Sequence, residues 1–208
     1  MIDEQRNTAQ PGTGLSGLMD RFLGPETTHV ELILEIIAGM GATVFVLLWA
    51  ALGEAGWSAA QYLVAAIITL DVAGGAVANA TVATKRWYHR PGQGFTQHMA
   101  FLAPHVVHLL LVAWFFRGEQ WSWAAAFYIY LMLAASIILR SPLYFRRPVA
   151  VLLFLGALLL DQYTFGPTVG LGWFIPAFFL KLLIGHLLPE TAVPESESTA
   201  IPSLKEGS

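Results

Sequence analysis

The chain has 208 residues, of which 56% are hydrophobic and only 12% are charged. Soluble domains carry about 25% charged residues, and a chain this short has too much surface for its volume to hide so much apolar material from water. The composition therefore excludes an ordinary soluble domain and predicts a membrane protein. The net charge of −3 offers no basic surface for nucleic acid, and the lack of cysteine excludes disulfides, iron–sulfur clusters and thiolate metal sites.

Residues 1–28 are predicted to form a cytoplasmic tail that ends in a short helix at the membrane surface. The first 14 residues are polar and have no early apolar run, so they do not resemble a signal peptide. In the stretch that follows, a helix would place its apolar side chains on one face and lie along the membrane before Gly24–Pro25 ends it. Thr28 and Glu31 have the spacing of a capping box for the next helix.

Residues 29–188 contain six apolar spans, which predict an all-α, six-transmembrane-helix bundle. A helix needs about 20 mainly apolar residues to cross a bilayer. The fourth and fifth spans are close to the lower limit, and the last two could instead form a re-entrant pair because the segment between them is rich in Gly and Pro. From Pro189 the sequence turns polar, so 189–208 is predicted to be a disordered cytoplasmic tail. The six spans are 30–52, 59–84, 96–116, 122–139, 148–165 and 170–188.

Lys and Arg residues are distributed very unequally between the two sides of this arrangement. Ten lie on or toward the side that holds both termini, and only Arg117 lies on the other side. Cytoplasmic loops carry the excess of Lys and Arg. The bias predicts that both termini are cytoplasmic in a multi-pass protein of the cell membrane, of the bacterial inner-membrane type, with membrane lipid as its surroundings.

One face of the second span and its continuation carries small and polar residues. If the helix runs on to residue 90, seven residues share a sector about 100° wide. This face is either a packing seam, since small residues let a neighbouring helix approach closely, or part of a functional site. Asp71 is the most costly member, because a charge near mid-membrane must be protonated, paired or in contact with water. The seven are Asp71, Gly75, Ala78, Asn79, Val82, Arg86 and His89.

Three histidines share one face of the third span. His98, His105 and His108 are spaced by two turns and then one turn of helix. The hairpin between the second and third spans brings His89 level with His98, and Asn79 level with His105. The pair His105–His108 could chelate a metal, although Val106 and Val107 fill the gap, so the zinc-protease pattern HExxH is not present.

These residues lead to a hypothesis of an intramembrane metal site that opens to the cytoplasm. Imidazole and carboxylate ligands suit zinc or iron, and metal-bound water is a usable nucleophile. The protein would then be an enzyme acting on a lipid-like small molecule. His89, His98, His105 and His108 would hold the metal, Glu35 and Asp71 would be catalytic, and Asn79, Arg86 and Arg90 would bind the substrate, the two arginines through an anionic headgroup.

Two other hypotheses stay open. The carboxylates, Asn79 and the histidines could line a proton path, which would make the protein a small proton-coupled transporter or channel. Alternatively, the histidines could simply be interfacial or hydrogen-bonded across helices, in a membrane scaffold or assembly factor that docks a partner on the small-residue face.

Overall fold

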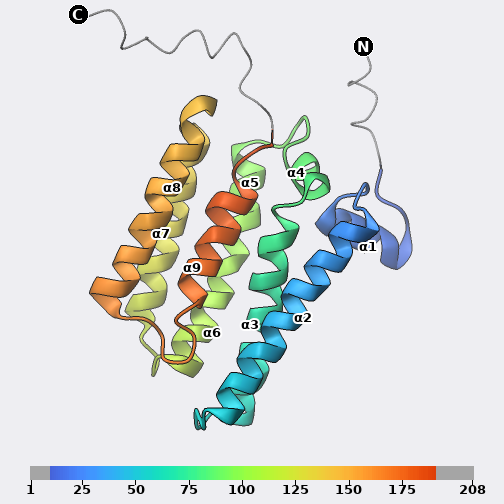
Figure 1. Cartoon of the computed structure of the whole chain (residues 1–208). Helices are drawn as coiled ribbons and strands as arrows, with labels where there is room; N and C mark the ends of the chain where they lie inside the picture. The colour runs from blue at the N-terminus through green and yellow to red at the C-terminus, as the bar shows by residue number, and fades with distance from the viewer. Residues whose placement is uncertain (1–9, 191–208) are drawn as a thin grey trace, which may run out of the picture.

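Long apolar helices run side by side in the part of the chain that the computed structural model describes, residues 10–190 (Figure 1). Within these residues, five segments are long and apolar enough to cross a membrane, and a sixth is a shorter apolar helix. The structure thus confirms an all-α bundle with several membrane-length helices. The five segments are His29–Leu52, Ala59–Ala78, Phe95–Phe116, Trp121–Arg140 and Leu143–Phe165, and the shorter one is Phe174–His186.

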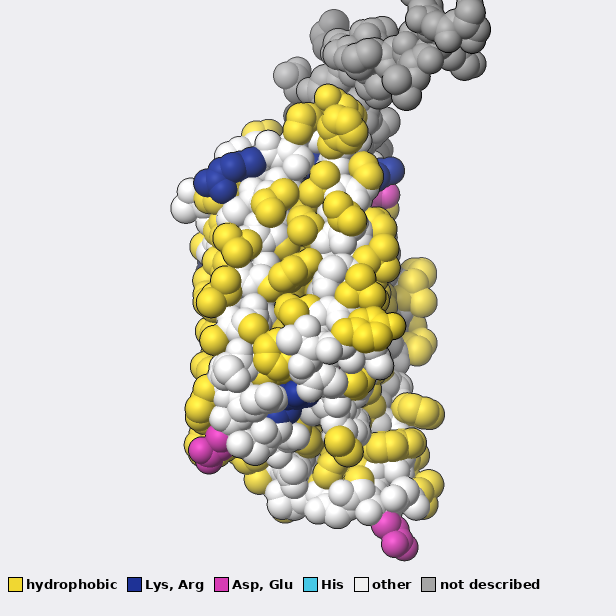
Figure 2. Space-filling view, turned by 90° about the vertical axis from the view of Figure 1, so that its left-hand side faces the viewer, with side chains coloured by type: hydrophobic (Ala, Val, Ile, Leu, Met, Phe, Trp, Pro, Cys, Tyr) yellow, Lys and Arg dark blue, Asp and Glu magenta, His cyan; other side chains and the backbone are white. Residues whose placement is uncertain are grey.

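The side chains are distributed as a lipid environment requires. Figure 2 shows one face of the bundle covered with hydrophobic side chains, with charged ones toward its two ends. Large apolar residues such as Phe45 and Leu152 are exposed, while aromatic rings fill the interior, among them Trp123, Phe127 and Phe178. Such a continuous exposed apolar surface would be a liability in water and is the expected outer surface of a membrane protein.

The predicted start of the bundle is confirmed. Helix α1 (Gly14–Leu23) ends at Gly24, whose φ of +98° is a conformation that L side chains rarely adopt. Thr28 then caps α2 (His29–Leu52). Its side chain accepts a hydrogen bond from the Glu31 backbone, and the Glu31 side chain accepts one from the Thr28 backbone. This is the reciprocal capping box expected from the sequence.

The sequence predicted that the second span runs to residue 84, but the helix ends earlier. Helix α3 (Ala59–Ala78) ends at Asn79, and a separate short helix, α4 (Val82–Tyr88), follows. Thr81 makes the break: its hydroxyl donates to the Ala78 carbonyl at 2.8 Å and accepts from the Thr84 backbone at 3.3 Å. A residue type that bonds the backbone in this way competes with the helix ladder and favours a cap. The seven-residue face predicted for one continuous helix is therefore cut after Asn79.

The third span is continuous but changes its winding in the middle. It consists of α5 (Phe95–Leu102), the 3₁₀ turn η2 (Ala103–His105) and α6 (Val106–Phe116). Pro104 lies inside the turn and lacks the N–H that an α-helix needs there. The tighter turn rotates the residues after it relative to those before it, so His98 separates from the other two histidines of the predicted face.

The fourth and fifth spans are longer than the sequence suggested. Helix α7 runs from Trp121 to Arg140, and α8 (Leu143–Leu160) continues into the π-helix η3 (Asp161–Phe165). The fifth span begins at Leu143 rather than at Pro148, so Pro148 lies inside the helix as its sixth residue. Asp161, the first residue of η3, is buried.

The last span is short and partly π-helical. It consists of α9 (Phe174–Phe179) and the π-helix η4 (Leu180–His186). Arg117, at the end of α6, holds the turn that leads into it. Its guanidinium donates to the carbonyls of Phe165 and Gly166 and to the Thr168 hydroxyl, at 2.9 to 3.0 Å. The turn before the last span is therefore hydrogen-bonded to the end of α6.

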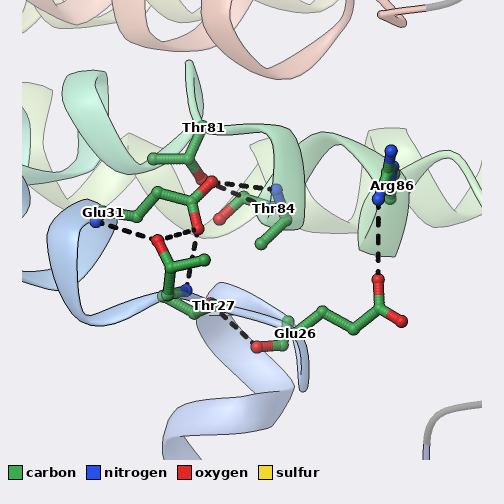
Figure 3. Close-up of polar contacts among 9 residues, drawn as sticks. Glu26, Thr27, Glu31, Thr81, Thr84 and Arg86 are labelled. Carbon is green, nitrogen blue, oxygen red and sulfur yellow. Dashed lines mark hydrogen bonds and ion pairs between the residues drawn. The ribbon is translucent and has the colours of Figure 1, made fainter.

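Helices α1 and α4 lie together at one end of the bundle, which we call the α4 end (Figure 1). The Leu23 carbonyl accepts a hydrogen bond from the Thr84 hydroxyl at 2.7 Å, and the Arg21 carbonyl accepts one from the Trp87 indole at 3.0 Å. Glu31 also accepts from the Ala83 backbone at 3.3 Å. Figure 3 shows Glu31, at the start of α2, beside Thr81 and Thr84, at the start of α4. The contacts fix α1 beside the site described next.

Candidate functional site

A cavity of about 530 Å³ lies between α1, α2, α3 and the last span, near the α4 end. Its walls are mainly apolar, and a small group of polar side chains converges on it from different helices: Glu35, Asp71, Asn79, His105 and Lys181. An apolar pocket with a few convergent polar groups is the usual form of a small-molecule site. Four of these five polar residues are among those proposed from the sequence.

Asp71 is the centre of an ion network at one wall of the cavity. One of its carboxylate oxygens, Oδ2, lies 2.5 Å from Lys181 Nζ and 2.9 Å from His108 Nε2. Lys181 also donates to the Asp71 backbone carbonyl at 3.2 Å. The Lys181 side chain is only 4% exposed, whereas that of Asp71 is 45% exposed. The carboxylate thus neutralises a buried ammonium and remains accessible from the cavity.

Gly75 makes this ion pair geometrically feasible. A Cβ at position 75 would lie 2.6 Å from Lys181 Cε and 2.8 Å from Nζ. The Lys181 side chain therefore lies directly against the backbone of α3, one turn after Asp71. A second pair of glycines brings α2 and α3 together: a Cβ at Gly74 would lie 3.5 Å from the Gly39 Cα. Small residues on α3 thus serve both helix packing and the site, the two interpretations that the sequence left open.

Asn79, directly after α3, and Lys85, on α4, donate hydrogen bonds to carbonyls of the last span. Asn79 Nδ2 donates to the Lys181 carbonyl at 3.2 Å, and Lys85 Nζ donates to the carbonyls of Gly185 and Leu188, both at 2.7 Å. The carbonyls at a helix end lack partners within the helix, so side-chain donors are needed when that end is buried. Lys85 supplies two such bonds with a positive charge at the favourable end of the helix dipole.

A second histidine cluster lies closer to the α4 end. His98 Nδ1 is 3.1 Å from His186 Nε2, and His89 Nε2 donates to the His186 carbonyl at 2.9 Å. The rings of His89 and His98 are 4.8 Å apart, as expected from their predicted similar depth in the hairpin. Burial, with added repulsion from nearby positive groups, lowers the pKa of His89 from 6.5 to about 4. This imidazole is therefore neutral at physiological pH.

Phe101 separates the two groups of histidines. Its ring stacks on that of His186 at 3.8 Å between centroids and contacts that of His105 at 5.3 Å. On the cavity side, His105 and His108 stack on each other at 5.3 Å. The Nδ1 of His105 donates to the Phe101 carbonyl at 3.0 Å, which leaves its Nε2 as an acceptor. An apolar ring thus interrupts the row of imidazoles.

The hypothesis of a metal centre finds no support in the part of the chain that the structure describes. Within residues 10–190, no group of three or more His, Asp or Glu side chains is arranged to hold a metal ion. The four predicted ligands are divided between two clusters: His89 and His98 bond to His186, while His105 and His108 bond to the Phe101 carbonyl and to Asp71. The break at residues 79–81 and the turn at Pro104 account for the division.

The two arginines proposed to bind a headgroup lie outside the residues that line the cavity. Arg86 pairs with Glu26 at 3.8 Å, and both side chains are exposed (Figure 3). The Arg90 guanidinium lies 3.4 Å from the centroid of the Trp87 ring and donates to the Trp87 carbonyl. The other proposed residues, Glu35, Asp71 and Asn79, line the cavity.

Sequence reasoning missed Lys181 and His186 as members of the site. Lys181 was counted as a cytoplasmic flanking charge, but it lies in the apolar run FFLKLLIG and is buried against Asp71. The signal was available, because a lysine inside an apolar span needs a counter-charge, and Asp71 is the acid deepest in the second span. His186 is the last residue of the span that also holds Lys181. Its contacts depend on how the last span packs, which one sequence does not reveal.

Comparisons with protein-family models, with curated proteins and with solved structures give no match to this chain.

Proposed function

We propose that the protein is a proton-coupled membrane transporter in which Asp71 exchanges the proton and the adjacent cavity holds the transported molecule. The observation that carries this proposal is the network of Asp71, Lys181 and His108 at the wall of that cavity, in which Lys181 is buried. Ionisable side chains inside a membrane are costly, and proton relays of transporters are a main use of them. The accessible face of Asp71 gives a proton a route to the carboxylate.

The network also links protonation to a change of structure. A proton on Asp71 would remove the negative charge that neutralises Lys181, which is 4% exposed and lies against Gly75. An uncompensated buried ammonium is strongly unfavourable, so η4 would have to shift to relieve it. The π-helix carries Lys181, and π-helical turns are frequent at functional sites. Proton binding and movement of the last span are thereby coupled.

In this proposal the chain crosses the membrane six times, with both termini in the cytoplasm. The short helix Phe174–His186 completes its crossing with the turn that precedes it. The distribution of Lys and Arg supports the orientation. Lys181 drops out of the flanking charges because it is paired inside the bundle, which still leaves nine residues against Arg117 alone. The cavity then opens near the cytoplasmic side, in a multi-pass protein of the cell membrane.

The pairing of Asp71 with His108 also resembles a carboxylate that orients a general base, which is the observation in favour of an intramembrane enzyme acting on a lipid-like substrate. In that role His108 would use its other nitrogen, Nδ1. That atom is buried without a hydrogen-bond partner, and His108 is not among the residues that line the cavity. A base must reach its substrate, so the geometry favours proton transfer at Asp71 over catalysis by His108.

Proton flux in liposomes tests the proposal. Purified protein is reconstituted with a pH-sensitive dye inside, and a pH gradient is imposed. The wild type should dissipate the gradient faster than protein-free vesicles, and Asp71→Asn should abolish the difference. The double variant Asp71→Asn/Lys181→Met should behave in the same way without leaving a buried unpaired charge. Asp161→Asn is the matched control, a buried acid that does not line the cavity. Flux that is absent in the wild type, or unchanged in both Asp71 variants, would refute the proposal.

A further inference from the structure

Glu35 faces the same cavity and has no ionic partner. It is 7% exposed, and its Oε1 is completely buried without a hydrogen bond. It lies six residues into α2, about 9 Å from the start of the helix at 1.5 Å per residue. Asp71 lies seven residues before the end of the antiparallel helix α3, about 10 Å from the same end. The two carboxyl groups therefore enter the cavity at similar depth, but only Asp71 is paired.

Glu35 is consequently the acidic side chain of the cavity that lacks an ionic partner. Among the described residues that line it, Lys181 is the one Lys or Arg, and its ammonium is already held by Asp71 at 2.5 Å. An anion would meet Glu35 with no free cation to balance it. A cation would pair with Glu35, whose burial otherwise carries a penalty without compensation.

The rest of the cavity suits an apolar body. Its walls include the aromatic rings of Phe22, Tyr88 and Phe101, and the aliphatic chains of Ile36 and Met40. Aromatic faces attract organic cations, and the volume of about 530 Å³ is in the range of sites for drug-sized ligands. Phe22, Ile36 and Met40 are each more than half exposed on the surface of the bundle. A molecule dissolved in the membrane can therefore enter from the side.

We infer that the cavity binds a hydrophobic amine or another lipophilic organic cation, with Glu35 as its counter-charge. This inference rests on the proposed transport function for its coupling, since the cation at Glu35 and the proton exchanged at Asp71 would share one cavity. On Glu35 itself, a proton would compete with the cation. The titratable groups around Glu35 from each packed element are Glu31 on α2, Asp71 on α3, Tyr88 on α4, His105 on η2 and Lys181 on η4.

Binding of tetraphenylphosphonium to the full-length protein in detergent tests this inference by isothermal titration calorimetry. The wild type should bind at about pH 8, and its affinity should fall measurably toward about pH 5.5 because protons compete with the cation for the Glu35 carboxyl group. Glu35→Gln should bind weakly at both pH values, whereas Glu35→Asp, which keeps the carboxylate, should retain binding that weakens at low pH. Triphenylphosphine oxide, which has similar aromatic groups but no charge, should bind without a dependence on Glu35.

Glu31→Gln is the matched control. Glu31 lies one turn earlier on the same helix, is engaged with Thr28 and Ala83, and does not line the cavity. It should bind the cation as the wild type does. Equal affinity of the wild type and Glu35→Gln, or affinity that does not change with pH, would overturn the inference. Proton flux without cation binding would reject this ligand class alone, and cation binding without proton flux would reject only the proposed transport.

Discussion

The two partners of the ion pair between Asp71 and Lys181 are buried to different extents. Lys181 is almost fully buried, whereas nearly half of the Asp71 side chain is accessible from the cavity. Removing one partner of a buried ion pair leaves an uncompensated charge, and the more deeply buried partner suffers more from being left alone. The local stability of the site therefore depends mainly on keeping Lys181 paired.

A double-mutant cycle should reveal this asymmetry. We expect Asp71→Asn to lower the free energy of unfolding by about 3–5 kcal/mol, because Lys181 stays charged and buried without its partner. Lys181→Met should cost less, since the remaining carboxylate can be hydrated. The double variant should be more stable than Asp71→Asn alone. The measurement is unfolding in detergent by denaturant or heat. Simple additivity of the two single effects would contradict the coupling.

At the scale of single residues, the sequence identified the polar side chains that are expensive to bury in a membrane. It identified less well the side chains that pair with them. Glu35, Asp71, Asn79 and His105 were chosen because polar groups in apolar spans are expensive, and all four line the cavity. The same rule applies to Lys181, because a lysine inside an apolar span needs a counter-charge such as Asp71. Arg86 was placed by extending one helical face beyond Asn79, where the helix in fact ends.

At the scale of the elements, helix irregularities decide which side chains meet. The break at Thr81, the turn at Pro104 and the π-helix η4 each rotate the residues that follow. Periodicity at 100° per residue cannot anticipate these rotations, because it assumes uniform winding. The helix α4 that results from the first break carries His89 onto the end of the last span, where it bonds the His186 carbonyl.

This contact should make the stability depend on pH. The pKa of His89 is about 4 in the folded protein, below its ordinary value of 6.5, mainly because the ring is buried. The unfolded chain therefore binds more protons between these values, and stability should fall as the pH drops from about 6.5 toward 4. We expect His89→Gln to lose less thermal stability than the wild type over this interval.

The measurement is the unfolding temperature in detergent at several pH values. His29→Gln serves as the control, because His29 is exposed at the start of α2. This control should follow the pH profile of the wild type. If His89→Gln and the wild type lose stability in parallel, the contribution of His89 would be excluded.

At the scale of the whole molecule, the long apolar spans were enough to predict a helical membrane bundle, because about 20 consecutive apolar residues can cross a bilayer as a helix that satisfies its own backbone. Five of the six predicted spans appear as membrane-length helices. The packing of the last span against α3 could not be deduced from one sequence. It depends on particular fits, such as Lys181 over Gly75, that leave no periodic pattern.

The six-crossing arrangement can be tested by labelling single cysteines, since the chain has no cysteine of its own. Ala55→Cys lies in the loop between α2 and α3, and Gln93→Cys lies in the hairpin between α4 and α5. In intact cells, a membrane-impermeant maleimide should label position 55 only. Position 93 should react after the membrane is opened. Labelling of position 93 in intact cells would contradict the proposed orientation.

The clamp made by Arg117 limits how the bundle can move. Its three bonds join the end of α6 to the turn before α9, so the foot of the last span is anchored to its neighbour. Toward the other end, the same span is held by hydrogen bonds from Asn79 to the Lys181 carbonyl and from Lys85 to the carbonyls of Gly185 and Leu188. Displacement of Lys181 would therefore rotate the last span about its anchored beginning. The largest movement would be at its other end, where His186 contacts His98.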